Sequence, residues 1–370
     1  MSKSSEIQSL LEKLTLDEKA QLCSGSDFWH LHGIEHLDLP SIMVTDGPHG
    51  LRKQSEEADH IGLAESVAAT CFPTASGLAA TWNIDLIKKV GVTLAKECRT
   101  EQVSVILGPG VNIKRHPLGG RNFEYFSEDP FLTGKLASGL IEGIQSEGIG
   151  TSIKHFAVNN HETGRMVVDA IVDERTLREI YLPGFEIPIK ESQPWTVMCS
   201  YNKVDGTYLS ENHRLLTEIL RDEWGFDGIV MTDWGATNQR IEGIKAGLDL
   251  EMPASGRLNT DRIIKAVQSG ELSYDKLDAC VTRLLALIIK SRRLLNDNHQ
   301  HSANEHHQVA KLAALEACVL LKNEQQNLPL STSDKVGVIG ALAKDTRYQG
   351  SGSSQINPTH LDQPLEAISL

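Results

Sequence analysis

Short apolar runs alternate with longer amphipathic segments along most of the chain. The runs end in polar residues or glycine, and the segments between them repeat apolar residues at i, i+3 and i+4. We predict strands at Ser41–Thr45, Val103–Leu107, Thr151–Phe156, Trp195–Ser200, Gly228–Thr232 and Leu248–Glu251. We predict helices at Asn83–Glu101, Pro130–Ser146, Glu174–Lys190, His213–Trp224 and Thr237–Ala246, and a long helical segment from Thr260 to Leu295.

This alternation of strands and helices indicates the α/β class. The predicted strands are almost continuously apolar, which is typical of a parallel sheet covered on both faces. Because the pattern extends over roughly 250 residues, it favours a (β/α)8 TIM-like barrel over an open doubly wound sheet. We assign residues 1–295 to this barrel.

The polar stretch NDNHQHSANEHHQ follows the barrel segment and predicts a linker, residues 296–307. Its histidines His299, His301, His306 and His307 could ligate a metal, but they lack carboxylate or cysteine partners at ligand spacing, which favours a solvated linker. Residues 308–370 indicate one helix in VAKLAALEACVLLKN and one buried strand in KVGVIGALA. One helix and one strand cannot close a core, so we expect this second domain to be incomplete.

Composition narrows the class of protein and of partner. The 370 residues are 40% hydrophobic and 23% charged, with 36 Lys and Arg against 49 Asp and Glu, which indicates a globular, acidic protein. The net charge of -13 argues against nucleic acid or an anionic membrane as partner and favours a small neutral substrate. Without a secretory leader, a membrane span or a CxxC pair, we expect a cytoplasmic protein with free thiols.

Polar residues follow the predicted strands at the points where these end. Asp46 follows IMVT, Lys154 and His155 lie within TSIKHF, and Asp233 follows IVMT. The carboxyl ends of barrel strands share one face, so we expect these side chains to converge on one pocket. For each motif alone, a structural role stays open, such as a turn or helix-capping aspartate or a satisfied Lys–His pair.

The long loop from Gly108 to Pro130 is rich in arginine, asparagine and glutamate, and we select Arg121 from it as a site residue. For Arg115, Glu124 and Glu128 an ion-pair network within the loop is favoured over substrate contact. Asp233 beside Trp234, with cationic donors nearby, suits a polyhydroxylated ring whose face stacks on the indole.

Taken together and in order, the motifs resemble those of glycoside hydrolase family 3, specifically the N-terminal barrel of its β-glucosidase branch. The resemblance covers essentially the whole chain and rests on the segments SIMVTDGPHGLR, ATCFPTASGLAATW, GPGVNIKRHPLGGRNFEYFSEDP, KHFAVNNHETGRM, MCSYNKVDGTYLSEN and GIVMTDWGA. The tail with LLKNEQQNLPLS and QGSGSS resembles the opening of the family's second domain, an α/β sandwich. His161 and Gly164 depart from the family's common residues and leave the substrate preference open.

The resemblance implies roles for individual residues. Asp233 would be the nucleophile of a retaining mechanism acting on a small β-glucoside or oligosaccharide, with no metal and no organic cofactor. The implied substrate-binding residues are Asp46, Arg121, Lys154 and His155, which would hold the sugar in the −1 subsite; Arg52, Arg165, Met198 and Tyr201, which would line it; and Trp234, which would reach toward the aglycone.

In this family the acid/base glutamate comes from the second domain, beyond the Gly/Ser loop. We therefore expect a truncated chain that lacks this glutamate and that forms homo-oligomers through its incomplete domain. The alternative is a catalytically impaired sugar-binding or interaction protein derived from the family. A phosphate-binding barrel would rest on Gly350–Ser354 alone, which no lysine and no convincing helix follow.

Overall fold

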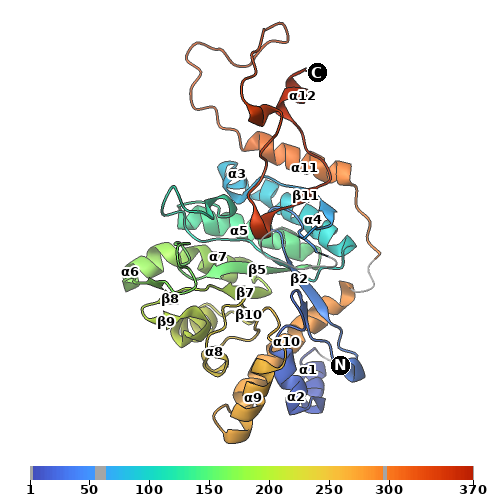
Figure 1. The fold of residues 1–370 in the computed structure, drawn as a ribbon, viewed down its shortest axis with the longest axis vertical. Coiled ribbons are helices and arrows are strands. Elements are labelled where there is room, and N and C mark those ends of the chain that lie inside the picture. Colours follow the sequence, from blue (N-terminus) through green and yellow to red (C-terminus); the bar gives the residue numbers. More distant parts are fainter. Residues whose placement is uncertain (1–2, 55–63, 295–297, 370) are drawn as a thin grey trace.

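The computed structural model describes residues 3–54, 64–294 and 298–369, and its centre is one buried sheet (Figure 1). The strand order is β1-β2-β4-β5-β7-β10, with β1 antiparallel to β2 and every later pair parallel. The strands are β1 (His30–Leu31), β2 (Ile42–Asp46), β4 (Val105–Leu107), β5 (Gly150–Phe156), β7 (Thr196–Cys199) and β10 (Ile229–Thr232). All residues of the parallel strands are buried, as their apolar sequences predict.

The predicted strand Leu248–Glu251 is wrong, and the strands form an open run rather than eight parallel barrel strands. The amides of both Asp249 and Leu250 donate to the carbonyl of Val230, at 2.9 and 3.0 Å. Two successive donors on one acceptor break the ladder, so single bridges replace it. These bridges join Met231 to Leu250, Ser24 to Glu251 and Gly25 to Leu31, so that they run from β10 back to β1.

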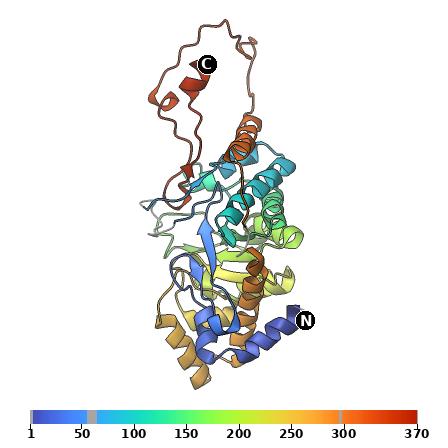
Figure 2. The same ribbon diagram turned by 90° about the vertical axis from the view of Figure 1, so that its right-hand side faces the viewer.

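Helices surround this sheet, and among them α4, α5 and α7 pack most closely against one another (Figures 1 and 2). The α-helices of the body are α1 (Lys3–Lys13), α2 (Leu16–Leu22), α3 (Ala75–Ala80), α4 (Ile84–Thr100), α5 (Pro130–Ser146), α6 (Glu174–Thr176), α7 (Pro183–Ser192), α8 (Arg240–Ala246), α9 (Leu258–Ser269) and α10 (Tyr274–Ser291). Short turns of helix are η1 (Glu35–Leu37), η2 (Asn122–Glu124), η4 (Leu209–Glu211) and η6 (Arg292–Leu294), and η3 (Leu177–Tyr181) and η5 (Arg214–Glu223) are π-helical. None of the described helices is both long and apolar enough to cross a membrane.

Glycines allow the close approach of α4 and α5. A Cβ atom at Gly91 would lie 2.6 Å from the carbonyl oxygen of Leu140, and one at Gly143 would lie 2.1 Å from that of Lys88. Neither distance is possible for real atoms, so these two positions require glycine for the helices to touch. The predicted helices at both places are confirmed, and Pro130–Ser146 has the predicted bounds.

Two predicted helices are interrupted. The segment Glu174–Lys190 divides into α6, η3 and α7 around Pro183, since proline lacks the amide hydrogen that a continuous helix needs. The segment from Thr260 divides into α9 and α10, because Gly270 adopts a left-handed conformation (φ 79°) and Ser273 caps the next helix. The predicted end at Leu295 lies outside the described residues.

The remainder of the chain leaves the body after helix α11 (Ala303–Glu316), which lies along α4. The elements that follow are η7 (Ala341–Ala343), η8 (Gly352–Ser354), β11 (Asn357–Pro358) and α12 (Pro364–Ser369). The strand predicted in KVGVIGALA is wrong: residues 335–343 pair with no strand in the described part of the chain, and Ile339 is 96% exposed. Helix α11 begins inside the segment predicted as a linker, whose residues 296 and 297 lie outside the described part.

Two small sheets complete the topology. Strands β6 (Asp169–Ala170), β8 (Lys203–Val204) and β9 (Thr207–Tyr208) form one of them. In the other, β11 pairs in parallel with β3 (Ala68–Ala69), with Asn357 opposite Ala68. This pairing returns the tail to the body at the edge where β2 ends.

Candidate active site

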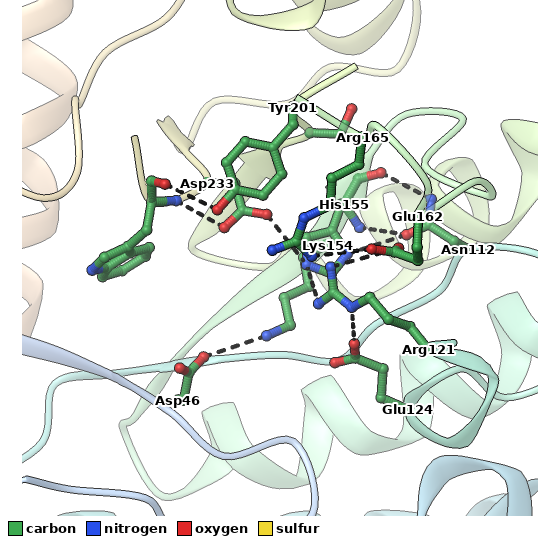
Figure 3. Close-up of polar contacts among 12 residues, drawn as sticks. Asp46, Asn112, Arg121, Glu124, Lys154, His155, Glu162, Arg165, Tyr201 and Asp233 are labelled. Carbon is green, nitrogen blue, oxygen red and sulfur yellow. Dashed lines mark hydrogen bonds and ion pairs between the residues drawn. The ribbon is translucent and has the colours of Figure 1, made fainter. Parts of the chain in front are cut away.

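The predicted site residues converge on one pocket of about 430 Å³ (Figure 3). Its lining includes every predicted residue except Arg52, namely Asp46, Arg121, Lys154, His155, Arg165, Met198, Tyr201, Asp233 and Trp234. Arg52 is buried beside the pocket, where its Nη1 lies 3.9 Å from Oδ2 of Asp46. The expected convergence at the strand ends is thus confirmed, while the roles of the individual residues stay predictions.

Asp233 follows β10 and is held by backbone groups. Its Oδ1 accepts a hydrogen bond from the amide of Trp234 at 2.8 Å, and its own amide donates to the carbonyl of Cys199 at 3.0 Å. The Tyr201 hydroxyl donates to the Trp234 carbonyl at 2.9 Å. Burial, and then the charge of Asp233, raise the pKa of Tyr201, so this hydroxyl keeps its proton. The carboxylate of Asp233 therefore has a fixed orientation and a neutral phenol beside it.

His155 is neutral in this site. Burial, followed by the charges of Arg121 and Lys154, lowers its pKa well below the ordinary value. The guanidinium of Arg121 has no acceptor atoms, so at 2.8 Å from Nη2 the Nε2 of His155 must accept. The 3.6 Å approach of that same nitrogen to Asp233 is consequently not an ion pair.

Asn112, which the sequence reasoning missed, fixes the position of His155. Its Oδ1 accepts the backbone amide of His155 at 2.8 Å, and its Nδ2 donates to the carbonyl at 2.9 Å. Oδ1 also lies 3.3 Å from Nδ1 of His155, the nitrogen that carries the proton. The motif GPGVNIK contained this residue, but nothing in its spacing pointed across to the next strand.

Asp46 ends β2 and faces two buried cations. Its Oδ1 lies 3.5 Å from Nζ of Lys154, and its Oδ2 lies 3.9 Å from Arg52. Burial raises the pKa of the Asp46 carboxyl above its ordinary value, against the opposing charges of Lys154 and Arg52. These distances leave the oxygens of Asp46 able to accept further hydrogen bonds from hydroxyl groups.

Arg121 forms an ion pair with Glu124 and lies 4.0 Å from Glu162. Burial acts to raise the pKa of Glu124, but the charges of Arg121 and Lys154 outweigh it and hold that pKa below its usual range. The pairing favoured for Glu124 from the sequence is confirmed, yet its side chain also lines the pocket. Glu162, also missed, pairs with Arg165 at 3.1 Å. Arg115 instead bonds the Tyr181 hydroxyl, away from the pocket.

Aromatic residues from the N-terminal segment support Trp234. Its Nε1 donates to the carbonyl of Phe28 at 3.0 Å, and its ring lies 5.1 Å from that of Trp29. Trp234 is only 7% exposed, so one edge of the indole reaches the pocket while the rest is packed. The sequence reasoning identified Trp234 but not these two supporting residues.

The tail contributes part of the pocket lining. Ser351, Gly352, Ser353 and Ser354 belong to its lining, together with Phe123 and Gly120 from the long loop. Residues 352–354 form a single short helical turn and not the start of an α-helix that could bind phosphate. The serines instead add small hydroxyl groups to the pocket lining.

His49 lies next to the site but outside its lining. It is 2% exposed, and among the described residues neither of its ring nitrogens has a hydrogen-bond partner. Burial lowers its pKa to about 4, against the charge of Glu124. His49 is therefore a neutral, buried imidazole in the folded protein.

The pocket combines carboxylates, cations and one indole edge in a partly enclosed space. In this pocket, cationic side chains lie beside the carboxylates, and carboxylate oxygens can still accept hydrogen bonds. Such a lining suits a neutral ligand with many hydroxyl groups. Within the described chain, the clusters that could hold a metal lie elsewhere, at Glu97 with His301 and His306, and at His307 with His360 and Asp362. The arrangement at the pocket fits displacement at a sugar carbon by the Asp233 carboxylate.

Comparison with known proteins agrees with this geometry. Residues 55–287 match the sequence profile of the glycosyl hydrolase family 3 N terminal domain, and residues 318–370 match that of the glycosyl hydrolase family 3 C-terminal domain. The chain is 54% identical over 363 residues to a thermostable beta-glucosidase B of Acetivibrio thermocellus, covering 98% of this chain and 48% of that protein.

Two further relatives are similar over nearly the whole chain. An exo-alpha-(1->6)-L-arabinopyranosidase of Bifidobacterium longum is 52% identical, with 97% of this chain and 48% of that protein covered. Beta-glucosidase 3B of Thermotoga neapolitana, solved in complex with glucose, superimposes with a TM-score of 0.92 at 41% identity, covering 98% of this chain and 54% of that one. The chain thus spans about half the length of the relatives it matches.

Proposed function

Because this chain belongs to glycosyl hydrolase family 3, we propose that the protein carrying it is a retaining β-glucosidase-type hydrolase in which Asp233 is the nucleophile. The observation that carries the proposal is the position of Asp233. Asp233 follows directly after strand β10, and the Trp234 amide orients its carboxylate. The cationic and acidic side chains of the surrounding pocket suit sugar hydroxyls. The glycosidic bond of a terminal, non-reducing β-D-glucosyl residue is the proposed substrate.

In the proposed reaction, Asp233 attacks the anomeric carbon and forms a covalent glycosyl ester as the leaving oxygen departs. Water then hydrolyses the ester and restores the carboxylate. Asp46 accepts hydrogen bonds from the sugar hydroxyls, and Lys154 donates to them. Arg121 and His155 bind the opposite side of the sugar. Met198, Tyr201 and Arg165 line the sugar-binding side, while Trp234 faces the aglycone.

A retaining enzyme needs a second carboxyl group about 5 to 5.5 Å from the nucleophile to act as acid and then as base. Of the other carboxylates in the pocket lining, Asp46 is assigned to the sugar hydroxyls and Glu124 is paired with Arg121. His155 cannot replace them, since its Nε2 accepts from Arg121. We therefore propose that the acid/base group comes from outside the described residues.

A second candidate glycone is an α-L-arabinopyranosyl unit, as in the name of the Bifidobacterium longum relative. The measurement that separates the two is the ratio of kcat/KM for the two 4-nitrophenyl glycosides. A ratio above 10 in favour of the β-glucoside supports the first candidate, and a ratio below 0.1 supports the second.

The test of the mechanism is trapping with a 2-fluoro β-glucoside bearing a 2,4-dinitrophenyl leaving group, which needs little acid catalysis. We expect the label on the peptide that contains Asp233. Asp227→Asn is the matched control, because Asp227 is exposed at the other end of the same strand, β10. Label on a different carboxylate would refute the nucleophile. Sugar binding without any label in the intact protein would favour the catalytically impaired sugar-binding protein.

The remaining expectations stand as part of the proposal. A closed (β/α)8-type barrel over residues 1–295 stays a proposal, in which the single bridges between β10 and β1 would be the contacts that close the sheet. Residues 296–307 would then connect it to an α/β sandwich that starts at residue 308, and contacts through this domain would form a homo-oligomer. A cytoplasmic location is proposed as well, and cell fractionation tests it.

A further inference from the structure

Away from the pocket, three metal-binding side chains from distant parts of the sequence come together. Glu97 lies on α4, His301 precedes α11, and His306 lies in the first turns of α11. One candidate ligand atom from each of these residues lies within 4.8 Å of the other two. The cluster therefore spans the contact between the body and the start of the tail, where α11 lies along α4 (Figures 1 and 2).

The carboxylate of Glu97 is buried and fixed. Its side chain is 2% exposed, and its Oε2 accepts the backbone amide of Thr70 at 3.0 Å. Its Oε1 lies 2.7 Å from Nδ1 of His306, which is also buried. One oxygen is thus anchored by the backbone, while the other faces the histidines, as in many metal-binding carboxylates.

His301 has a hydrogen bond of the kind that orients metal-binding histidines. Its Nδ1 lies 2.9 Å from Oγ1 of Thr100, and this hydroxyl donates its proton to the carbonyl of Lys96 at 3.1 Å. Thr100 must then accept from His301, so Nδ1 carries the proton and Nε2 keeps its lone pair. The outer partners of histidine ligands fix the tautomer in this way.

A fourth nitrogen lies on the same segment. His299 is two residues before His301, and its Nε2 is buried with no hydrogen-bond partner among the described residues. The rings of His301 and His306 are stacked, with centroids 4.8 Å apart and planes within 10°. The hydrogen bond between Glu97 and His306 explains why these two side chains lie together. It does not explain why His301 lies beside them, or why Nε2 of His299 is buried without a partner among the described residues.

We propose that Glu97, His301 and His306 bind a divalent transition-metal cation, with His299 or water as the fourth ligand. Imidazole nitrogens and one carboxylate, without thiolates, suit Zn²⁺ in tetrahedral geometry, at distances near 2.0–2.1 Å. The lone pair of an imidazole nitrogen lies in the plane of the ring, so metal binding requires the stacked rings of His301 and His306 to turn toward a common point. Bound there, the cation joins the linker segment to α4 and fastens the second part of the chain to the first.

The experiment is equilibrium dialysis of the metal-stripped intact protein against Zn²⁺, followed by elemental analysis. We expect one tightly bound Zn²⁺ per chain, lost in His301→Ala. His360→Ala is the matched control, since it removes a histidine from the other cluster, with His307 and Asp362. A second variant, Thr100→Val, keeps all ligands and the side-chain shape, and it should weaken binding about 10- to 100-fold by freeing the His301 ring.

Co²⁺ in place of Zn²⁺ gives an independent spectroscopic reading, because tetrahedral coordination produces strong visible absorption. Loss of that absorption in His301→Ala, and its retention in His360→Ala, support the site. The proposal is overturned by a wild-type protein that binds no stoichiometric Zn²⁺. It is also overturned if His301→Ala binds Zn²⁺ as tightly as the wild type, or if His360→Ala loses binding as completely as His301→Ala.

Discussion

Arg121 directs its Nη2 to Nε2 of His155 at 2.8 Å, and this contact decides where the imidazole can carry a proton. The guanidinium can only donate, so Nε2 accepts and the proton resides on Nδ1, toward Asn112. The nitrogen nearest Asp233 therefore offers that carboxylate no proton. Arg121 thus keeps His155 from neutralising the proposed nucleophile.

Replacing Arg121 should let His155 titrate. In Arg121→Gln, the loss of the cation should raise the pKa of His155, which could then pair with Asp233 and neutralise its charge. NMR titration of the imidazole between pH 4 and 8 measures this, together with a new inflection in kcat/KM. Arg115→Gln, in the same loop but bonded to Tyr181, is the control. A His155 resonance that does not respond to Arg121→Gln would contradict the assignment.

Asp233→Asn should lower kcat by at least about 10³-fold in the intact protein, because an amide cannot form the glycosyl ester. The backbone bond from Trp234 can be kept by the amide oxygen, so the circular dichroism spectrum should not change. Asp227→Asn should leave kcat within about twofold. An active, folded Asp233→Asn protein would rule out this residue as the nucleophile.

His49 should make the folded protein sensitive to acid. Its pKa is lowered to about 4 in the folded state, whereas the unfolded chain binds the proton near the ordinary value of 6.5. The unfolded state therefore binds more protons as the pH falls from 6.5 to 4, and the free energy of unfolding should drop by roughly 2 to 3 kcal/mol.

The measurement for His49 is urea unfolding at pH 7 and at pH 4.5. His49→Gln removes the titrating group, while all other groups titrate equally in both proteins. The difference in the free energy of unfolding between variant and wild type should therefore change by most of that amount between pH 7 and pH 4.5. An equal pH dependence in the two proteins would show that the pKa of His49 is the same in the folded and unfolded states, which contradicts the lowered pKa.

The exposed apolar residues of the tail should make the 370-residue chain self-associate. Leu321 is 91% exposed and Ile339 is 96% exposed, and no described residue covers them. The double variant Leu321→Lys, Ile339→Lys should weaken association by about tenfold or more, because it removes apolar area from the contact and adds charge. Sedimentation velocity measures this, with Lys322→Gln as the control for an exposed change in the same segment. A monomeric wild-type chain at 100 μM would refute the expectation.

The sequence predicted best where apolar runs and their polar ends coincide. Strand β5 with Lys154 and His155 at its end, and strand β10 followed by Asp233, lie where the pattern placed them. Both runs are buried on both faces, so hydrophobicity alone fixes their position. The ends of parallel strands then bring the polar residues together without further information.

The sequence predicted less where a partner lies far along the chain. Asn112 follows β4 and bonds His155 on the next strand, β5, and Glu97 on α4 meets His306 on α11. No spacing rule connects either pair. The segment KVGVIGALA has the composition of a buried strand, but a strand needs a neighbour, and the described chain gives it none. The irregular bridges at Leu250 likewise depend on hydrogen bonds that apolar pattern does not encode.

The short ladder between β3 and β11 has a mechanical consequence. Asn357 is paired with Ala68 on the body, and only Gln355 and Ile356 separate it from Ser354 in the pocket lining. A segment this short spans at most about 10 Å, so residues 351–354 stay close to β11. Because β3 holds Asn357, a displacement of the chain beyond β11 does not pull directly on residues 351–354, and exchange of these residues offers a way to change the pocket lining without disturbing Asp233.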